Sequence, residues 1–488
     1  MTGTPPGPDP RSLAGVRPSH RQWEWQRTEF YGFVHVGVNT MTDREWGAGH
    51  EDPALFDPAA LDADAWVRTF ADAGMRGVVL TAKHHDGFCL WPSAQTTHTV
   101  AASPWRGGQG DLVAEVSRAC ARHGLKFGVY LSPWDRTEAS YGSGAAYDDF
   151  FVAQLTELLT GYGDVFSVWF DGANGEGPDG RVQEYDWDRY HRVVRALQPG
   201  AVLSVCGPDV RWCGNEAGHT RADEWSVVPH ELRSAERTAE ASQKVDDGTF
   251  SRAVRSDVED LGSRRALAGY RGECVWYPAE VNTSIRPGWF HHPAEDGAVR
   301  SAEELFALWR RAVGGNATFL LNVPPAADGR LGVPDVAALA GLGSLLREFA
   351  AADLLTGADL RFSSGAAVPL SIGRDADPTP WRPAEDDGQP AVDAGWPTPA
   401  PVRAVCVRED VRAGQRVELL DVSLLLAGTE VWSTTVASVG YQRIVDVPDV
   451  EADGLRVVVR GSRGTPHLLG LAVRPTPDPT GVSASARP

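Results

Sequence analysis

Cysteine, positive charge and long apolar runs are all scarce in this sequence. Its 488 residues include six cysteines and no Cys-x-x-Cys pair, which is typical of separate, reduced thiols. Lys and Arg total 46 against 65 Asp and Glu, which gives a formal net charge of −19 at pH 7. This excess of negative charge argues against nucleic-acid backbones and anionic membranes as partners.

The N-terminal stretch also lacks the features of a targeting segment. Residues 1–17 carry Pro, Gly and Asp without the apolar core of a signal peptide, and no run of 18 apolar residues occurs in the chain. We therefore expect a cytoplasmic protein, with export left open for a chain whose leader has been removed. The sequence carries no signal for an oligomeric state.

Several motifs of common enzyme classes are missing as well. No Gly-x-Gly-x-x-Gly follows a predicted strand, and no phosphate-binding P-loop is present, which disfavours dinucleotide and nucleotide chemistry. The Gly-x-Ser-x-Gly elbow of serine hydrolases is also absent.

Strand-like and helix-like segments alternate over the first 350 residues. Helical periodicity covers residues 62–73, 111–123, 147–162, 185–197 and 302–313. The expected strands are residues 30–39, 77–82, 126–132, 167–170, 201–207, 224–228, 274–277 and 317–324. Such alternation indicates βα units, and eight units predict a TIM-like (β/α)8 barrel over residues 21–350, preceded by a disordered N-terminus at 1–20.

The pattern changes after residue 350. Short strand-like segments separated by turns, such as residues 402–407 and 455–459, predict a C-terminal β-sandwich domain over 351–475. Residues 377–401 contain seven prolines and suggest a long surface excursion, and the charged, weakly periodic residues 230–270 suggest an insertion. Residues 476–488 are expected to form a disordered tail.

A carboxylate stands at the end of the fourth predicted strand. Ser167-Val168-Trp169-Phe170 runs directly into Asp171-Gly172, and side chains at the C-terminal ends of barrel strands point into the active-site mouth. A carboxylate there costs desolvation energy unless polar groups surround it, so Asp171 is a candidate for chemistry. The alternative is a turn Asp that caps the next helix.

Polar and aromatic side chains stand at the ends of most other predicted strands too. They are His35, His84, His85, Asp86, Tyr130, Ser132, Asn215, Glu216, Glu224, Trp225, Glu280, Asn282, Arg286 and Trp289. A pocket rich in hydrogen-bonding groups and aromatic rings suits a neutral polyol with one apolar face. Neighbouring His84 and His85 would point to opposite faces of an extended strand, which favours hydrogen bonding over joint ligation of a metal.

These motifs together resemble the α-L-fucosidases of glycoside hydrolase family 29. The resemblance rests on residues 33–37 (FVHVG), 45–46 (EW), 83–88 (KHHDGF), 128–132 (GVYLS), 169–172 (WFDG) and 320–325 (LLNVPP), in the same order as in the family. It implies a barrel followed by a β-sandwich, and a retaining hydrolysis of terminal α-L-fucose from a fucosylated oligosaccharide or glycoconjugate, without a metal or other cofactor.

The resemblance also implies roles for individual residues. Asp171 corresponds to the nucleophile, and the loop of residues 212–218 resembles the subgroup that prefers α-1,3/1,4-linked fucose, which makes Glu216 the acid/base and Glu280 its rival. The fucose pocket would be lined by His35, Glu45, Trp46, His84, His85, Tyr130, Trp169, Arg286 and Trp289.

Two further hypotheses come from outside this enzyme class. The chain could be a catalytically inactive fucose- or glycan-binding protein on the same fold, because fold alone does not give function. The β-sandwich could itself bind carbohydrate, for which Trp381, Trp396 and Trp432 are the available aromatic platforms, although packing explains Trp432 equally well.

Overall fold

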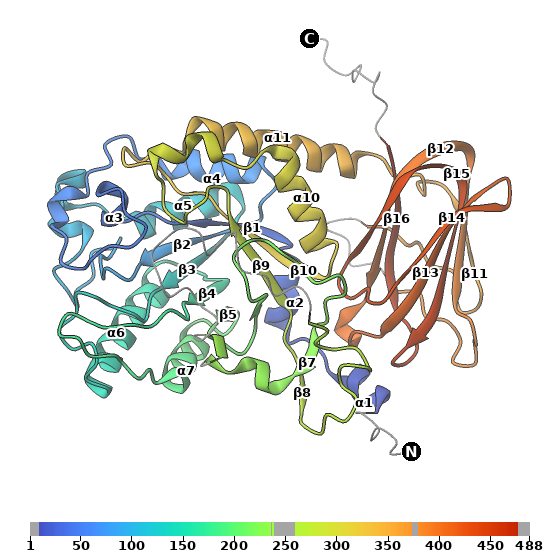
Figure 1. The fold of residues 1–488 in the computed structure, drawn as a ribbon, viewed down its shortest axis with the longest axis horizontal. Helices are drawn as coiled ribbons and strands as arrows, with labels where there is room; N and C mark the ends of the chain where they lie inside the picture. Colours follow the sequence, from blue (N-terminus) through green and yellow to red (C-terminus); the bar gives the residue numbers. More distant parts are fainter. Residues whose placement is uncertain (1–8, 236, 239–258, 373–378, 477–488) are drawn as a thin grey trace, which may run out of the picture.

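The chain folds into a barrel and a separate antiparallel sheet domain, which stand side by side in Figure 1. The computed structural model describes residues 9–235, 237–238, 259–372 and 379–476. Most of the predicted insertion at 230–270 and nearly all of the predicted tail at 476–488 lie outside the described residues.

Eight parallel strands form the barrel, in the order β5-β4-β3-β2-β1-β10-β9-β6. An isolated parallel bridge between Ser204 and Val210 links the two end strands, so the barrel is nearly closed. The strands are β1 Phe30–Val34, β2 Gly77–Lys83, β3 Lys126–Leu131, β4 Ser167–Phe170, β5 Val202–Val205, β6 Arg211–Trp212, β9 Ala279–Ser284 and β10 Ala317–Asn322. The predicted TIM-like barrel is confirmed.

Helices surround this barrel, and their starts are set by side-chain caps. Asp62, Asp111 and Ser301 each accept hydrogen bonds from backbone N–H groups in the first turn of α4, α5 and α10. The helices are α1 Pro10–Gly15, α2 His20–Gln26, α3 Val38–Met41, α4 Ala63–Asp72, α5 Leu112–His123, α6 Ala145–Gly161, α7 Trp187–Leu197, α10 Ala302–Val313 and α11 Val333–Ala351. Short 3-10 turns are η1 Pro53–Leu55, η2 Val100–Ala102, η3 Trp105–Gly108, η4 His230–Arg233, η5 Pro293–Ala298 and η6 Val411–Ala413.

The predicted disorder over residues 1–20 is wrong for the part that the structure describes, residues 9–20, while residues 1–8 lie outside the described residues. Residues 10–15 form α1, and Leu13 is buried in a small apolar cluster with Trp276 and Val411. The polar composition of the segment hid this one apolar anchor, which docks it between the barrel and the C-terminal domain.

The sixth and seventh barrel strands differ from the prediction. Residues 227–229 (β7, Val227–Pro229) and 274–276 (β8, Cys274–Trp276) pair antiparallel in a sheet of their own. Their side chains Val228 and Val275 pack in a separate cluster with Trp225, which explains the apolar signal that suggested barrel strands. The barrel uses β6 and β9 instead, and β6 is too short to be recognised from periodicity.

The C-terminal domain is an antiparallel sheet of six strands with its own apolar core. The strands are β11 Asp359–Phe362, β12 Ala391–Glu409, β13 Val417–Leu426, β14 Thr429–Val436, β15 Arg443–Ser462 and β16 Leu468–Pro475. The predicted surface excursion at 377–401 is wrong from Ala391 onward. Pro397 and Pro399 fall in a register break of β12, between Gly395 and Ala400, where the strand tolerates residues that lack an N–H.

The tryptophans considered as sugar platforms in this domain serve the core. Trp381 is fully buried and Trp396 is 7% exposed, and Trp432 packs against the same cluster. None of the described helices combines the length and the apolar character that a membrane span requires.

Candidate active site

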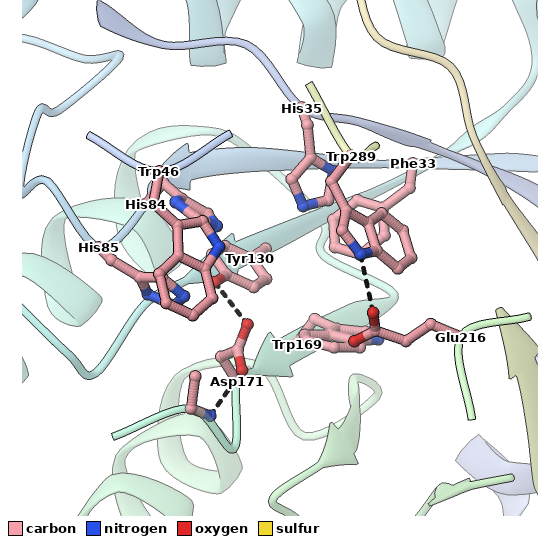
Figure 2. Close-up of a pocket in the computed structure, with 11 residues that line it drawn as sticks. Phe33, His35, Trp46, His84, His85, Tyr130, Trp169, Asp171, Glu216 and Trp289 are labelled. Carbon is pink, nitrogen blue, oxygen red and sulfur yellow. Dashed lines mark hydrogen bonds between the residues drawn. The ribbon is translucent and has the colours of Figure 1, made fainter. Parts of the chain in front are cut away.

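A pocket opens at the C-terminal ends of the barrel strands. The lining residues, drawn in Figure 2, are Phe33, His35, Trp46, His84, His85, Tyr130, Trp169, Asp171, Ala173, Glu216 and Trp289. Nine of them were predicted as site residues; Phe33 and Ala173 were not, and Glu45, Glu280 and Arg286 lie elsewhere.

Asp171 directly follows β4 and faces the pocket. Its Oδ2 accepts a hydrogen bond of 2.8 Å from the Tyr130 hydroxyl, and its Oδ1 accepts one of 2.7 Å from the Ala173 backbone N–H. Burial raises the pKa of this carboxyl, and the two hydrogen bonds oppose the rise because they favour the ionised form. The two hydrogen bonds hold both oxygens of the carboxyl group in a defined orientation.

Glu216 reaches the same pocket from the loop that follows β6. Its Oε2 accepts a hydrogen bond of 3.0 Å from the Trp289 indole N–H, as Figure 2 shows. Burial raises the pKa of Glu216 to about 8, and the negative charges of Asp171 and Glu45 contribute to the rise. At neutral pH this carboxyl therefore holds a proton.

Two of the three pocket histidines, His35 and His85, are neutral and have tautomers that their hydrogen bonds define. Burial lowers the pKa of His35 to about 3 and that of His85 well below its usual range. The Asn322 amide N–H groups donate elsewhere, so its oxygen must accept from His35 Nδ1 at 2.8 Å. Ser132 donates its hydroxyl proton to the Trp134 carbonyl and accepts from His85 Nδ1 at 2.7 Å. Nε2 of each histidine is thus left as an acceptor for a donor such as a sugar hydroxyl.

His84 and His85 do not point to opposite faces, contrary to the expectation from an extended strand. β2 ends at Lys83, and the chain turns immediately, with Gly87 at a φ of +80°. Both imidazoles consequently line the pocket, with ring centroids 4.0 Å apart. Among the described residues, no group of three or more His, Cys, Asp or Glu side chains is arranged to hold a metal ion.

Glu45 lies behind the pocket wall rather than in it. Its carboxylate accepts hydrogen bonds from the backbone N–H groups of Trp289 at 2.5 Å and Phe290 at 3.2 Å. His292 Nε2 lies 3.2 Å from the same carboxylate, and the hydrogen bonds to Glu45 and Asp43 raise the pKa of His292 to about 9. Glu45 and His292 therefore fasten the segment that carries Trp289.

The structure does not bring Arg286 or Glu280 into the pocket. The Arg286 side chain is fully buried and pairs with Asp335 at the start of α11, with Nη2 2.6 Å and Nε 3.0 Å from its two oxygens. Glu280 is fully buried within the barrel, where its Oε1 accepts from the Trp169 indole at 2.9 Å. The sequence could not distinguish these buried positions from that of Trp289 in the pocket, because all three residues follow the same predicted strand, residues 274–277.

Phe33 was missed although a signal for it existed. It precedes His35 by two residues at the end of β1, and residues two apart share a face of a strand. Its ring centroid lies 5.3 Å from that of Trp169 and 6.2 Å from that of Trp289, so it contacts two of the three indoles of the pocket.

Comparison with known proteins shows which family the chain matches. The α-L-fucosidase family model matches residues 16–350, which include the whole barrel and every pocket residue. Alpha-L-fucosidase 1 of Arabidopsis thaliana is 36% identical over 466 residues, covering 93% of this chain and 87% of that protein.

Solved structures with the same architecture cover nearly the full chain. A glycoside hydrolase 29 family member from an unknown rumen bacterium has a TM-score of 0.77 at 33% identity, covering 96% of this chain and 79% of that one. A Ruminococcus gnavus GH29 fucosidase in complex with fucose has a TM-score of 0.79 at 26% identity, covering 98% and 97%.

Proposed function

Because the chain belongs to the α-L-fucosidase family of glycoside hydrolases, we propose that it releases terminal α-L-fucose with retention of configuration, through Asp171 and Glu216. Retaining hydrolysis requires two carboxyl groups at one site, one ionised and one protonated. The single observation that carries the proposal is that these two carboxyls line one pocket, where two donated hydrogen bonds orient Asp171 and the surroundings raise the pKa of Glu216 to about 8.

The first step forms a covalent intermediate. The Asp171 carboxylate attacks the anomeric carbon of fucose, the glycosidic C–O bond breaks, and Glu216 transfers its proton to the departing oxygen. The product is a fucosyl ester of Asp171. The Tyr130 hydroxyl, which donates to Asp171 Oδ2, holds the attacking carboxylate in place.

The second step returns both groups to their starting states. Glu216, now ionised, takes a proton from water, and the resulting hydroxide equivalent attacks the anomeric carbon and displaces Asp171. Neutral His35 and His85 offer acceptors to the sugar hydroxyls, and the Trp289 face offers an apolar surface for the C6 methyl group of fucose.

The stereochemistry and the two roles can be tested together. Proton NMR of the reaction should show α-fucose as the first product, before mutarotation. With azide added, Glu216→Ala should yield α-fucosyl azide, because azide attacks the intermediate, and Asp171→Ala should yield the β-anomer, because azide replaces the nucleophile. β-Fucose as the first product, or azide products of the reverse assignment, would overturn the mechanism.

We further propose a preference for α-1,3/1,4-linked fucose on branched glycans. The support is the resemblance of the loop at residues 212–218 to that subgroup, together with the position of Glu216 in this loop at the pocket. The test compares a Lewis-type trisaccharide with a simple aryl fucoside. Rapid cleavage of the aryl fucoside with no cleavage of the trisaccharide would contradict the preference.

No specific observation favours the inactive glycan-binding alternative, since both carboxyls face the pocket. Calorimetric binding of fucose by a preparation without any hydrolytic turnover would be the result that revives it.

A further inference from the structure

A third carboxylate, that of Glu280, lies fully buried beneath the pocket. Its strand, β9, presents a row of hydrogen-bond acceptors to the barrel interior at every second residue. Glu280 Oε1 accepts from Trp169 at 2.9 Å, and Asn282 Oδ1 accepts from the Trp212 indole at 2.9 Å. β9 therefore supports two indoles, one in the pocket floor and one at the base of the loop that carries Glu216.

The hydrogen bonds at Glu280 are all satisfied when its ionised carboxyl accepts both; burial raises the pKa of this carboxyl to about 7, and the two hydrogen bonds oppose the rise. An indole N–H can only donate, so Trp169 donates to Oε1. Tyr31 already accepts from the Trp25 indole at 3.1 Å, so its hydroxyl proton is free to donate to Oε2 of Glu280. Donors from β1 and β4 thus converge on the two oxygens of one side chain from β9, and an acceptor-only carboxylate matches both.

Trp169 connects this buried carboxylate to the reacting group. The indole stacks on the Tyr130 ring, with centroids 5.4 Å apart and an interplanar angle of 29°. The Tyr130 hydroxyl in turn donates to Asp171 Oδ2 at 2.8 Å. A rotation of the indole would therefore move Tyr130 and disturb the orientation of Asp171.

We propose that Glu280 is a positioning residue of the fucosidase reaction, which fixes the Trp169 indole and, through Tyr130, the carboxylate of Asp171. The inference rests on the proposed function, in which Asp171 is the nucleophile. For Glu280 this positioning role replaces that of rival acid/base, because Glu280 is absent from the pocket lining and both its oxygens already accept hydrogen bonds.

Glu280→Gln is the conservative variant. Its amide oxygen can still accept from Trp169, and the amide N–H can face Tyr31 while the tyrosine hydroxyl turns to Thr318 Oγ1. That oxygen is buried beside Glu280 in the strand register and has no hydrogen-bond partner in the described part of the chain. We expect kcat/KM within about 3-fold of wild type, since the indole keeps its acceptor.

Glu280→Met removes both acceptors while keeping the side-chain length. We expect kcat/KM to fall by roughly 10- to 100-fold through misplacement of the site, mainly in kcat. The loss should be equal for a dinitrophenyl fucoside and for an unactivated fucosyl disaccharide, because proton transfer to the leaving group is untouched. Glu216→Gln, measured in parallel, should lose far more on the disaccharide than on the activated substrate.

A double-mutant cycle with Trp169→Phe shows whether Glu280 acts through the indole. Once the donor N–H is gone, Glu280→Met should cost little further activity. Glu280→Asp, which keeps the charge but withdraws the carboxylate by one methylene, covers the case in which the Met variant does not fold. It should also lose activity equally on both substrates.

Three results would overturn the proposal: full activity of Glu280→Met and Glu280→Asp, additive losses in the cycle, or a loss in Glu280→Gln that grows as the leaving group worsens. The last would make Glu280 the acid/base. Full activity of Glu216→Gln on the disaccharide would instead refute the proposed function, while the coupling between Glu280 and Trp169 would still be measured independently.

Discussion

Carboxyl groups with a raised pKa occur both at the mouth of the barrel and in the C-terminal sheet domain, and their surroundings differ. Glu409 in the sheet domain is 1% exposed and accepts from the backbone N–H groups of Arg416, Val417 and Gly440 at 2.9, 2.8 and 2.7 Å. Glu216 at the barrel mouth accepts a single hydrogen bond among the described residues, from the Trp289 side chain.

The difference separates a structural carboxylate from one available for chemistry. Burial raises the pKa of both, to about 7 for Glu409 and about 8 for Glu216. A raised pKa alone therefore does not identify a catalytic group. Glu409 has its oxygens committed to three backbone donors that join segments of the sheet, whereas Glu216 and Asp171 face a cavity that a substrate can enter.

Among the variants that test this comparison, substitution of Asp171 should cause the largest loss of activity. Asp171→Asn keeps the size of the side chain and its contact with Tyr130 but removes the nucleophilic oxygen. We expect kcat for fucoside hydrolysis to fall by roughly 10⁴-fold or more. Thermal unfolding should change little, because the residue already faces a cavity. Residual activity above a few per cent of wild type would place the nucleophile elsewhere.

Glu216→Gln should have the second largest effect and should also change the pH profile. In the wild type, kcat/KM should fall as pH rises through about 8, because the acid loses its proton there. The variant should lose roughly 10²–10⁴-fold on unactivated fucosides and should lack this alkaline limb. An alkaline limb that persists unchanged in the variant would assign it to another group.

The variant Glu216→Gln also tests how the ionisation of Glu216 affects the stability of the fold. The folded-state pKa of Glu216 lies above its unfolded value, so its contribution to stability is complete below pH 4.5 and is lost as pH rises through about 8. Glu216→Gln, which cannot ionise, should therefore be more stable than wild type above pH 8. Melting curves at pH 6 and pH 9 measure this difference directly.

The sequence predicted more of the barrel mouth than of the rest, for a physical reason. Asp171 follows the buried strand β4, of four residues, and Tyr130 lies near the end of β3, of six residues; the geometry of a parallel barrel sends such strand ends to one place. Short elements gave no such signal. β6 has two residues, and its place in the barrel was assigned to residues of β7, whose apolar side chains pack in a different cluster.

The sequence also could not predict which polar residues near a strand end are buried away from the pocket. Glu280 and Arg286 looked equivalent to Glu216, because all are polar residues that follow or lie in predicted strands. Their placement depends on partners far away in the chain, Tyr31 for Glu280 and Asp335 for Arg286, and periodicity carries no information about such pairs. The turn that brings His84 and His85 to the same side likewise depends on Gly87, whose φ is positive.

At Glu409 we expect the opposite of the result at Asp171: a loss of stability without a loss of activity. Glu409→Gln presents one amide oxygen and one NH₂ group to three backbone donors, so at least one donor loses its partner. We expect a loss of about 1–3 kcal/mol in the free energy of unfolding. kcat/KM per folded molecule should stay within experimental error, because the residue lies in the other domain. A kinetic defect without a stability defect would remove the distinction between the two regions.

The smallest effect should come from His292, which stands between the two extremes because it holds the pocket wall without facing the substrate. Its pKa is raised from the ordinary value to about 9 by Glu45 and Asp43, so its stabilising contribution is complete below pH 6.5 and is lost as pH rises through about 9. In His292→Gln this pH-dependent part is missing. The difference in melting temperature between wild type and variant should therefore be largest near pH 6 and should shrink by pH 10. Because Glu45 still holds the backbone N–H groups of Trp289 and Phe290 when the ion pairs of His292 with Glu45 and Asp43 are lost, KM should rise by only about 2- to 5-fold. A difference in melting temperature that does not vary with pH would mean that His292 acts by packing and not by its charge.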